Sequence, residues 1–186
     1  DELFSRTEEV PITKEEVRSI IISKLRLKEN YNVIDIGSGS GSITVELCLQ
    51  CMRGNVYAID FDQKAIDLTQ ENLRRFNVYA NVIHGKAQDL LDSLPNVNAI
   101  VVGGTTGETE KIINQAISKL EKNGRIVIST ILVETMFRAM VTMKESDLMK
   151  DIDFTQISIL KGRNTATGTM MLARNPVLII SATKKS

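Results

Sequence analysis

Histidine, cysteine and tryptophan are scarce in this sequence: its 186 residues include one histidine, two cysteines and no tryptophan. A zinc site needs about four nitrogen or sulfur ligands. Cys48 and Cys51 have no second pair beside them, so no metal site is expected. A redox pair would open a helix after a strand, whereas these two fall inside an expected helix. We therefore expect them to be buried thiols in a reducing cytoplasm.

Long hydrophobic runs are also missing. No stretch of about 18 apolar residues occurs, so no membrane span is expected, and no secretory signal is recognisable. Hydrophobic residues make up 42% and charged residues 25% of the chain, which is typical of a globular protein. The length predicts a single domain over residues 1–186.

An excess of charge of either sign is absent as well, because 23 basic and 23 acidic residues give a formal net charge of zero. This balance argues against non-specific attraction to nucleic acid. The charges are nevertheless divided unevenly. Residues 154–186 contain five basic residues and no acidic one, which leaves 18 basic and 23 acidic residues in the rest. The C-terminal segment is therefore a candidate for contact with an anionic ligand.

Strand-like and helix-like segments alternate through most of the chain. A helix is expected to begin at Thr13, because Thr13 and Glu16 have the spacing of a capping box. Further helices are expected over residues 42–51, 62–76, 107–120 and 133–146. Strands are expected over residues 33–36, 56–59, 81–84, 99–102 and 125–129. This alternation predicts a doubly wound α/β fold with a mostly parallel sheet.

The rhythm changes near the C-terminus. Residues 154–160 and 176–182 are rich in β-forming residues, with no helical pattern between them. We expect an antiparallel hairpin of these two runs, closing one end of the sheet, with residues 161–175 as its connector.

The strongest local motif is Val33-Ile-Asp-Ile-Gly-Ser-Gly-Ser-Gly41. Small residues after a strand let a ligand approach the backbone at the positive end of the following helix. A plain tight turn remains open as an alternative. Asp60, at the end of the second expected strand, can accept both hydroxyls of a ribose, and Asp35 can hold a ligand ammonium.

This pattern resembles that of class I S-adenosylmethionine-dependent methyltransferases. The resemblance implies a Rossmann-like sheet with S-adenosylmethionine as cofactor. A dinucleotide-binding motif would have its third glycine at position 42, which is Ser42 here. A nucleotide-binding oxidoreductase stays as an alternative. The cofactor-binding residues that we expect are Thr13, Asp35, Gly37, Ser38, Gly39, Ser40, Gly41, Asp60 and Ala87.

Two departures from common methyltransferase patterns bear on the ligands. Many members have an acid after the third strand that meets the adenine amine, but this chain has Lys86. Adenine would then be recognised by backbone groups near Ala87. Enzymes that methylate base amines usually have an N/D-P-P-Y/F motif after the fourth strand, and this chain has Val101-Val-Gly-Gly-Thr-Thr-Gly-Glu108 instead. A methyltransferase acting on RNA or protein is kept as a second alternative.

A closer resemblance covers nearly the whole chain. Its segments are Pro11-x-Thr13, Val101-Val-Gly-Gly, Ile131-Leu-Val-Glu-Thr, Gly162-Arg163 and Gly168-Thr-Met-Met-x-x-Arg174-Asn-Pro176. They resemble the cobalt-precorrin C15-methyltransferases (decarboxylating) of cobalamin biosynthesis. The family implies methylation at C15 of a tetrapyrrole precursor, loss of carbon dioxide from the C12 acetate, and a homotetramer.

Such a substrate carries several carboxylates. Arg163 and Arg174 can each form a bidentate pair with one, and the family places their hairpin over the substrate. Both could instead pair with backbone carbonyls at a subunit contact. Glu134 could orient the substrate or relay a proton, or only compensate the charge of a helix N-terminus. No nucleophile or general base is identified, and an electron-rich macrocycle does not require one.

Overall fold

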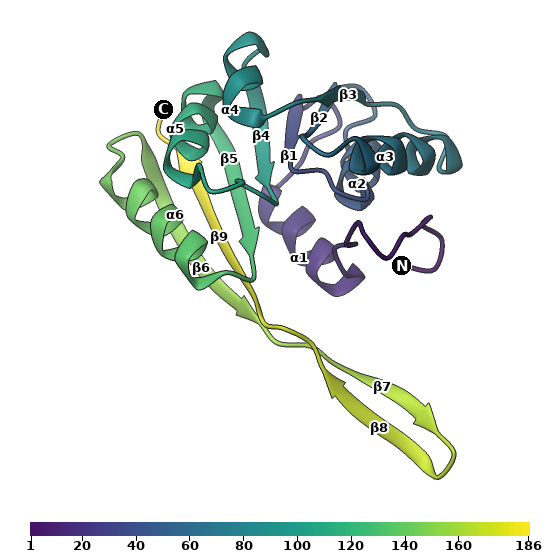
Figure 1. Cartoon of the computed structure of the whole chain (residues 1–186). Helices are drawn as coiled ribbons and strands as arrows, with labels where there is room; N and C mark the ends of the chain where they lie inside the picture. Colours follow the sequence, from purple (N-terminus) through teal and green to yellow (C-terminus); the bar gives the residue numbers. More distant parts are fainter.

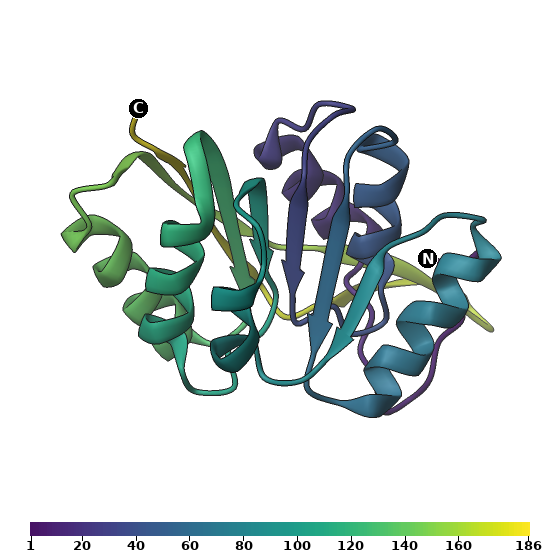
Figure 2. The same ribbon diagram turned by 90° about the horizontal axis from the view of Figure 1, so that it is seen from above.

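The computed structural model of the chain describes residues 1–186 and contains a seven-stranded sheet with helices on both faces, and a separate two-stranded ribbon (Figures 1 and 2). The strands are β1 (Val33–Ile36), β2 (Val56–Asp60), β3 (Asn81–His84), β4 (Val97–Val102), β5 (Leu120–Thr130), β6 (Met149–Ile157), β7 (Leu160–Thr165), β8 (Gly168–Ala173) and β9 (Val177–Lys184). The helices are α1 (Glu15–Leu25), α2 (Ser42–Gln50), α3 (Gln63–Arg75), α4 (Ala87–Leu90), α5 (Thr109–Lys119) and α6 (Val133–Glu145), with a 3-10 turn at Leu91–Ser93.

The order of strands in the large sheet is β3-β2-β1-β4-β5-β9-β6. β1 to β5 are mutually parallel, and β9 runs antiparallel to both β5 and β6. The expected doubly wound, mostly parallel sheet is therefore confirmed. The order reverses between β1 and β4, where the chain proceeds outward in both directions.

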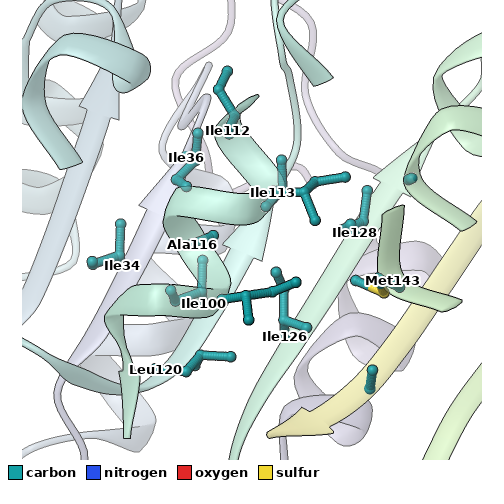
Figure 3. Close-up of a cluster of buried hydrophobic side chains, with 14 of the residues drawn as sticks. Ile34, Ile36, Ile100, Ile112, Ile113, Ala116, Leu120, Ile126, Ile128 and Met143 are labelled. Atoms are coloured by element: carbon teal, nitrogen blue, oxygen red, sulfur yellow. The ribbon is translucent and has the colours of Figure 1, made fainter. Parts of the chain in front are cut away.

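Two hydrophobic cores lie on opposite faces of the sheet, because successive side chains of a strand point to opposite sides. Ile34, Ile36 and Ile100 pack with α5 and α6, as Figure 3 shows for the labelled side chains. Val33 and Val101 pack instead with α1, α2 and α3. The central strands are buried on both faces, which explains their continuous apolar runs.

The two predicted helix caps have different outcomes. The side chain of Asp62 accepts a hydrogen bond from the backbone N–H of Lys64, 3.0 Å away, and caps α3 as expected. The capping box at Thr13 is wrong. α1 begins at Glu15 after an extended Lys14, and it has no side-chain cap. The Arg18 guanidinium donates to the carbonyl oxygen of Thr13 over 2.6 Å, which fixes the chain before the helix in another way.

The C-terminal strands also differ in part from the expectation. β6 and β9 form the predicted antiparallel pair, and β9 lies between β5 and β6. The expected connector, however, is not a loop. Its residues form the separate ribbon of β7 and β8, which projects away from the body of the protein (Figure 1). No long-range partner was predicted for this segment, and a two-stranded ribbon needs none within the sheet.

None of the helices combines the length and the hydrophobicity that crossing a membrane requires.

Candidate cofactor site

The glycine segment, residues 37–41, lies at the carboxyl ends of the parallel strands, where the strand order reverses. Ligands of doubly wound sheets bind at this position. The backbone of the segment is fixed to both neighbours of β1. The N–H groups of Gly37 and Ser38 donate to the carbonyl of Ile59 in β2, and Gly103 N–H, after β4, donates to the carbonyl of Ile36 over 2.8 Å.

Two glycines of this segment are required by space as well as by conformation. Gly37 has φ +74°, and a Cβ added there would lie 2.8 Å from the backbone nitrogen of Gly104. Gly41 has φ +72°, and a Cβ there would lie 2.8 Å from the Cα of Thr69 in α3. Both values of φ are strained for residues other than glycine. The loop can therefore come this close to β4 and to α3 only with glycine at these positions.

Asp60 ends β2 beside the glycine segment, with 7% of its surface exposed. One carboxylate oxygen accepts from Gly39 N–H over 2.8 Å, and the other accepts from Asp62 N–H over 3.0 Å. Each oxygen keeps a second lone pair, so the carboxylate can accept two further hydrogen bonds from a ligand. The structure thus brings Asp60 and the glycine segment together, as the sequence predicted.

Asp35 lies in β1 with only 1% of its surface exposed, and its carboxylate accepts from the Thr44 hydroxyl over 2.6 Å. Burial raises the pKa of this carboxyl from 3.8 to about 6, and the nearby Asp60 carboxylate adds to the rise. A cation bound next to Asp35 would favour its ionised form.

A pocket opens beside Asp60, between the ends of β1, β2 and β4. Its apolar lining includes Ile36, Ile59, Phe61, Ala87 and Ile112. Ala87, which was predicted, lies here together with Lys86 of the same turn. The lining residues outside the predicted cofactor-binding set are Ile36, Ile59, Phe61, Gly85, Lys86, Gly104, Thr106 and Ile112. Gly104 and Thr106 belong to the segment after the fourth strand that the sequence had singled out, and Phe61 directly follows the expected acid.

The remaining predicted residues lie elsewhere. Arg163 is exposed on β7, in the ribbon that projects from the body. Arg174 follows β8 and lines a second hollow, near α1. Glu134 is exposed in the first turn of α6. Thr13 precedes α1, and its carbonyl, not its hydroxyl, accepts the hydrogen bond described above. The structure does not place these four residues in the pocket beside Asp60.

The two cysteines and the single histidine lie in surroundings that fit a structural role. Cys48 and Cys51 are free and buried, and burial raises the pKa of their thiols to about 12 and about 11. Reactive thiols have lowered pKa values, so these surroundings fit packing. A ring nitrogen of His84 lies 2.9 Å from the carbonyl oxygen of Phe61. No three side chains among histidine, cysteine, aspartate and glutamate are grouped as a metal site.

Comparison with known proteins decides the family. The sequence-family model named "Precorrin methyltransferase domain" matches residues 2–184 of this chain. The chain belongs to the precorrin methyltransferase family. It is a methyltransferase, as the resemblance implied.

Relatives of this methyltransferase agree with that assignment. It is 43% identical, over 99% of its length and 94% of the relative, to a probable cobalt-precorrin-6B C(15)-methyltransferase (decarboxylating) of Saccharolobus solfataricus. A crystal structure of precorrin 8W decarboxylase from Methanobacterium thermoautotrophicum has 36% identity and a TM-score of 0.90, with 97% of each chain covered. That of a precorrin-6y C5,15-methyltransferase from Geobacter metallireducens has 28% identity and a TM-score of 0.91, covering 99% of this chain and 95% of that one.

Proposed function

We propose that residues 1–186 form one domain that transfers a methyl group from S-adenosylmethionine to C15 of a cobalt-precorrin in cobalamin biosynthesis, with loss of carbon dioxide from the C12 acetate. The proposal depends on one observation above all. Asp60 and the glycine segment meet where the strand order of the sheet reverses, in a chain of the precorrin methyltransferase family. The segment is not a dinucleotide motif, because Ser42 stands where that motif has its third glycine.

The residues of the site fit S-adenosylmethionine. The glycine segment packs closely against its neighbours at Gly37 and Gly41, and its Ser40 N–H has no partner within the chain, so this donor is left for a ligand. Asp60 can accept the ribose hydroxyls, and the apolar pocket beside it suits adenine, with Ala87 offering backbone groups. The buried carboxylate of Asp35 suits the ammonium group of the methionine part.

When bound, S-adenosylmethionine supplies a methyl group on a sulfonium ion. The residues of the chain would contribute positioning and exclusion of water, which are sufficient for an electron-rich carbon nucleophile. Carbon dioxide would leave the C12 acetate with its bonding electrons taken up by the macrocycle, and a proton would replace it. Glu134, exposed at the start of α6, is our candidate to orient the substrate or to relay that proton.

A hollow near α1 offers contacts for the substrate's carboxylates. Its basic residues are Arg6, Lys14, Lys161 and Arg174. Lys161 is paired with Glu15 and with Glu16, whereas the other three form no ion pair. Its acidic residues are Asp1, Glu2 and Glu15. Arg174, with Arg6 and Lys14 beside it, is therefore our first candidate to bind a substrate carboxylate.

We also propose that the methyltransferase is a homotetramer of the cytoplasm. The ribbon exposes Leu160, Met170 and Met171, which are 59%, 48% and 57% accessible in the single chain. Such a ribbon is marginally stable alone, so contact with other copies would stabilise it. Within an assembly, Arg163 of the ribbon could reach the substrate of another subunit. The free, buried thiols suit a reducing compartment.

The activity can be tested with the tetrapyrrole precursor and methyl-labelled S-adenosylmethionine. We expect the product mass to show gain of the label and loss of carbon dioxide. Labelling of RNA or protein but not of the precursor would contradict the proposal and support the other methyltransferase class.

The same assay tests the substrate contact. Arg174→Ala should raise the KM for the precursor by about tenfold, because a charge-assisted pair is lost. Its Kd for S-adenosylhomocysteine should not change. A variant with unchanged KM and a lower melting temperature would show that Arg174 has only a structural role.

A further inference from the structure

Two buried polar residues of α3 hold the glycine segment from behind. Thr69 and Asn72 are both 0% exposed, and they share one face of the helix because they are three residues apart. Buried polar side chains are retained where their hydrogen bonds are used. The neighbouring Gln70 and Glu71 are exposed, so the two residues are polar members of the otherwise apolar buried face of α3.

Thr69 fixes the direction of a peptide group in the segment. Its hydroxyl lies 3.0 Å from the carbonyl oxygen of Gly39, to which it donates. In a trans peptide the C=O and the next N–H point in opposite directions. The N–H of Ser40 is therefore directed away from α3, and it has no hydrogen-bond partner within the chain. The chain leaves this donor unused, although Ser40 as a whole is only 2% exposed.

Asn72 joins the segment to a third part of the chain. Its amide nitrogen donates to the carbonyl of Ser40 over 2.8 Å and to the carbonyl of Ser5 over 3.1 Å. Its oxygen accepts from Ser5 N–H over 2.7 Å. One buried side chain is thus bonded on one side to the glycine segment and on the other to residues that precede α1.

Those residues, 4–11, form a strap along α3, which we call the N-terminal strap. Phe4 is buried with its ring centroid 4.6 Å from that of Phe76, and Val10 is buried against Leu68. Near its end, the carbonyl oxygen of Pro11 would lie 3.5 Å from a Cβ added at Gly39. The strap therefore reaches the glycine segment, and its one direct hydrogen-bonded link to that segment through α3 is Asn72.

We propose that Asn72 is a positioning residue that links the N-terminal strap to the glycine segment and thereby sets how long S-adenosylmethionine remains bound. This inference rests on the proposed function, since it assumes that the segment binds this cofactor. Asn72 touches neither the pocket nor the reacting atoms. It acts by fixing the Ser40 carbonyl, next to the peptide group that Thr69 orients, while the strap limits movement of the loop.

The test is the dissociation rate of S-adenosylhomocysteine, measured by stopped-flow displacement from the intact chain. Asn72→Ala removes three hydrogen bonds, and we expect koff to rise at least about tenfold with kon nearly unchanged. Asn72→Asp should behave similarly, because it keeps the acceptor for Ser5 N–H but loses both donors. Ser5→Pro acts from the strap side: it removes that N–H, together with the hydroxyl contacts to Glu71 and Arg75, and leaves the side chains of α3 and the loop in place, so it should also raise koff.

Two control variants separate this role from general stability. Glu71→Ala removes a contact with the Ser5 hydroxyl without touching Asn72. Ser181→Ala removes a buried hydrogen bond from Arg125, far along the chain in β9. Both should leave koff unchanged, even where the melting temperature falls.

The possible failures are distinguishable. If Asn72→Ala and Ser5→Pro bind and release S-adenosylhomocysteine like the wild type, the inference is wrong and the proposed function stands. If the wild type itself binds no S-adenosylhomocysteine, both are wrong. Hydrogen exchange gives a further readout: the Ser5 amide should exchange more slowly in the wild type when S-adenosylhomocysteine is bound, and unchanged exchange would contradict the link.

Discussion

The glycine segment and the β7–β8 ribbon differ in how many hydrogen bonds and packing contacts each makes with the rest of the chain. Backbone groups of the segment are bonded to β2 and to α3, and its glycines fit against neighbouring backbone. The two strands of the ribbon pair only with each other, and apart from the ion pairs of Lys161 with α1 the ribbon is exposed, with apolar side chains at its surface. The candidate cofactor site is therefore built within a single chain, whereas the apolar side chains of the ribbon have no cover within it, and we propose that further copies of the chain cover them.

Removal of the ribbon should have the largest effect on assembly. Replacing residues 160–173 with a short turn deletes Leu160, Met170 and Met171, the exposed apolar residues that would lie between subunits. We expect a monomer by light scattering, while the Kd for S-adenosylhomocysteine changes by less than about threefold. A shortened chain that still forms the wild-type assembly would show that the ribbon is not the interface.

Gly37→Ala should disrupt the glycine segment and weaken cofactor binding. A Cβ at this position would collide with Gly104 and would force a strained φ. We expect the affinity for S-adenosylhomocysteine to fall about 100-fold by calorimetry, which corresponds to about 3 kcal/mol.

Gly104→Ala is the matched control, because a Cβ there meets no atom within 4 Å. Its melting temperature should equal that of the wild type. Equal stability and affinity of both variants would contradict the close packing of the two loops.

Asp60→Ala should weaken binding about tenfold or more, because it removes the acceptor of Gly39 N–H as well as the proposed ribose contact. The assembly should persist. Unchanged binding of S-adenosylhomocysteine by this variant would remove Asp60 from the cofactor site.

Asp35→Asn should leave the assembly and the backbone of the site intact, and the size of its effect on stability depends on pH. The folded pKa of about 6 lies above the ordinary 3.8, so the folded state holds the proton more tightly. Stability contributed by this group is then full below pH 4 and is lost as the pH rises to about 6, on the order of 3 kcal/mol.

The variant should accordingly be more stable than the wild type at pH 7 and similar to it near pH 4, as measured by denaturant unfolding. Cofactor affinity of the wild type should fall as the pH drops through 6, because Asp35 must be ionised to hold an ammonium group. A stability difference that is the same at both pH values would contradict the raised pKa.

The sequence predicted the parallel strands and the junction of Asp60 with the glycine segment, because apolar periodicity and strand-end residues are local signals. It did not predict Thr69 or Asn72, since a polar residue on a helix gives no sign of the loop that will lie behind it. The ribbon was missed for a related reason: strands that pair outside the main sheet have exposed, mixed side chains, and they look like a loop. Thr13 shows the opposite failure, because a local capping pattern was overridden by the bond from Arg18.

Calorimetry of the wild-type chain with S-adenosylhomocysteine and, separately, with NAD tests the central claim most directly. The glycine segment with Ser42 at the position of a dinucleotide motif's third glycine, and Asp60 beside it, should bind S-adenosylhomocysteine with one site per chain and leave NAD unbound. Tight binding of NAD without binding of S-adenosylhomocysteine would contradict the assignment of this site to S-adenosylmethionine.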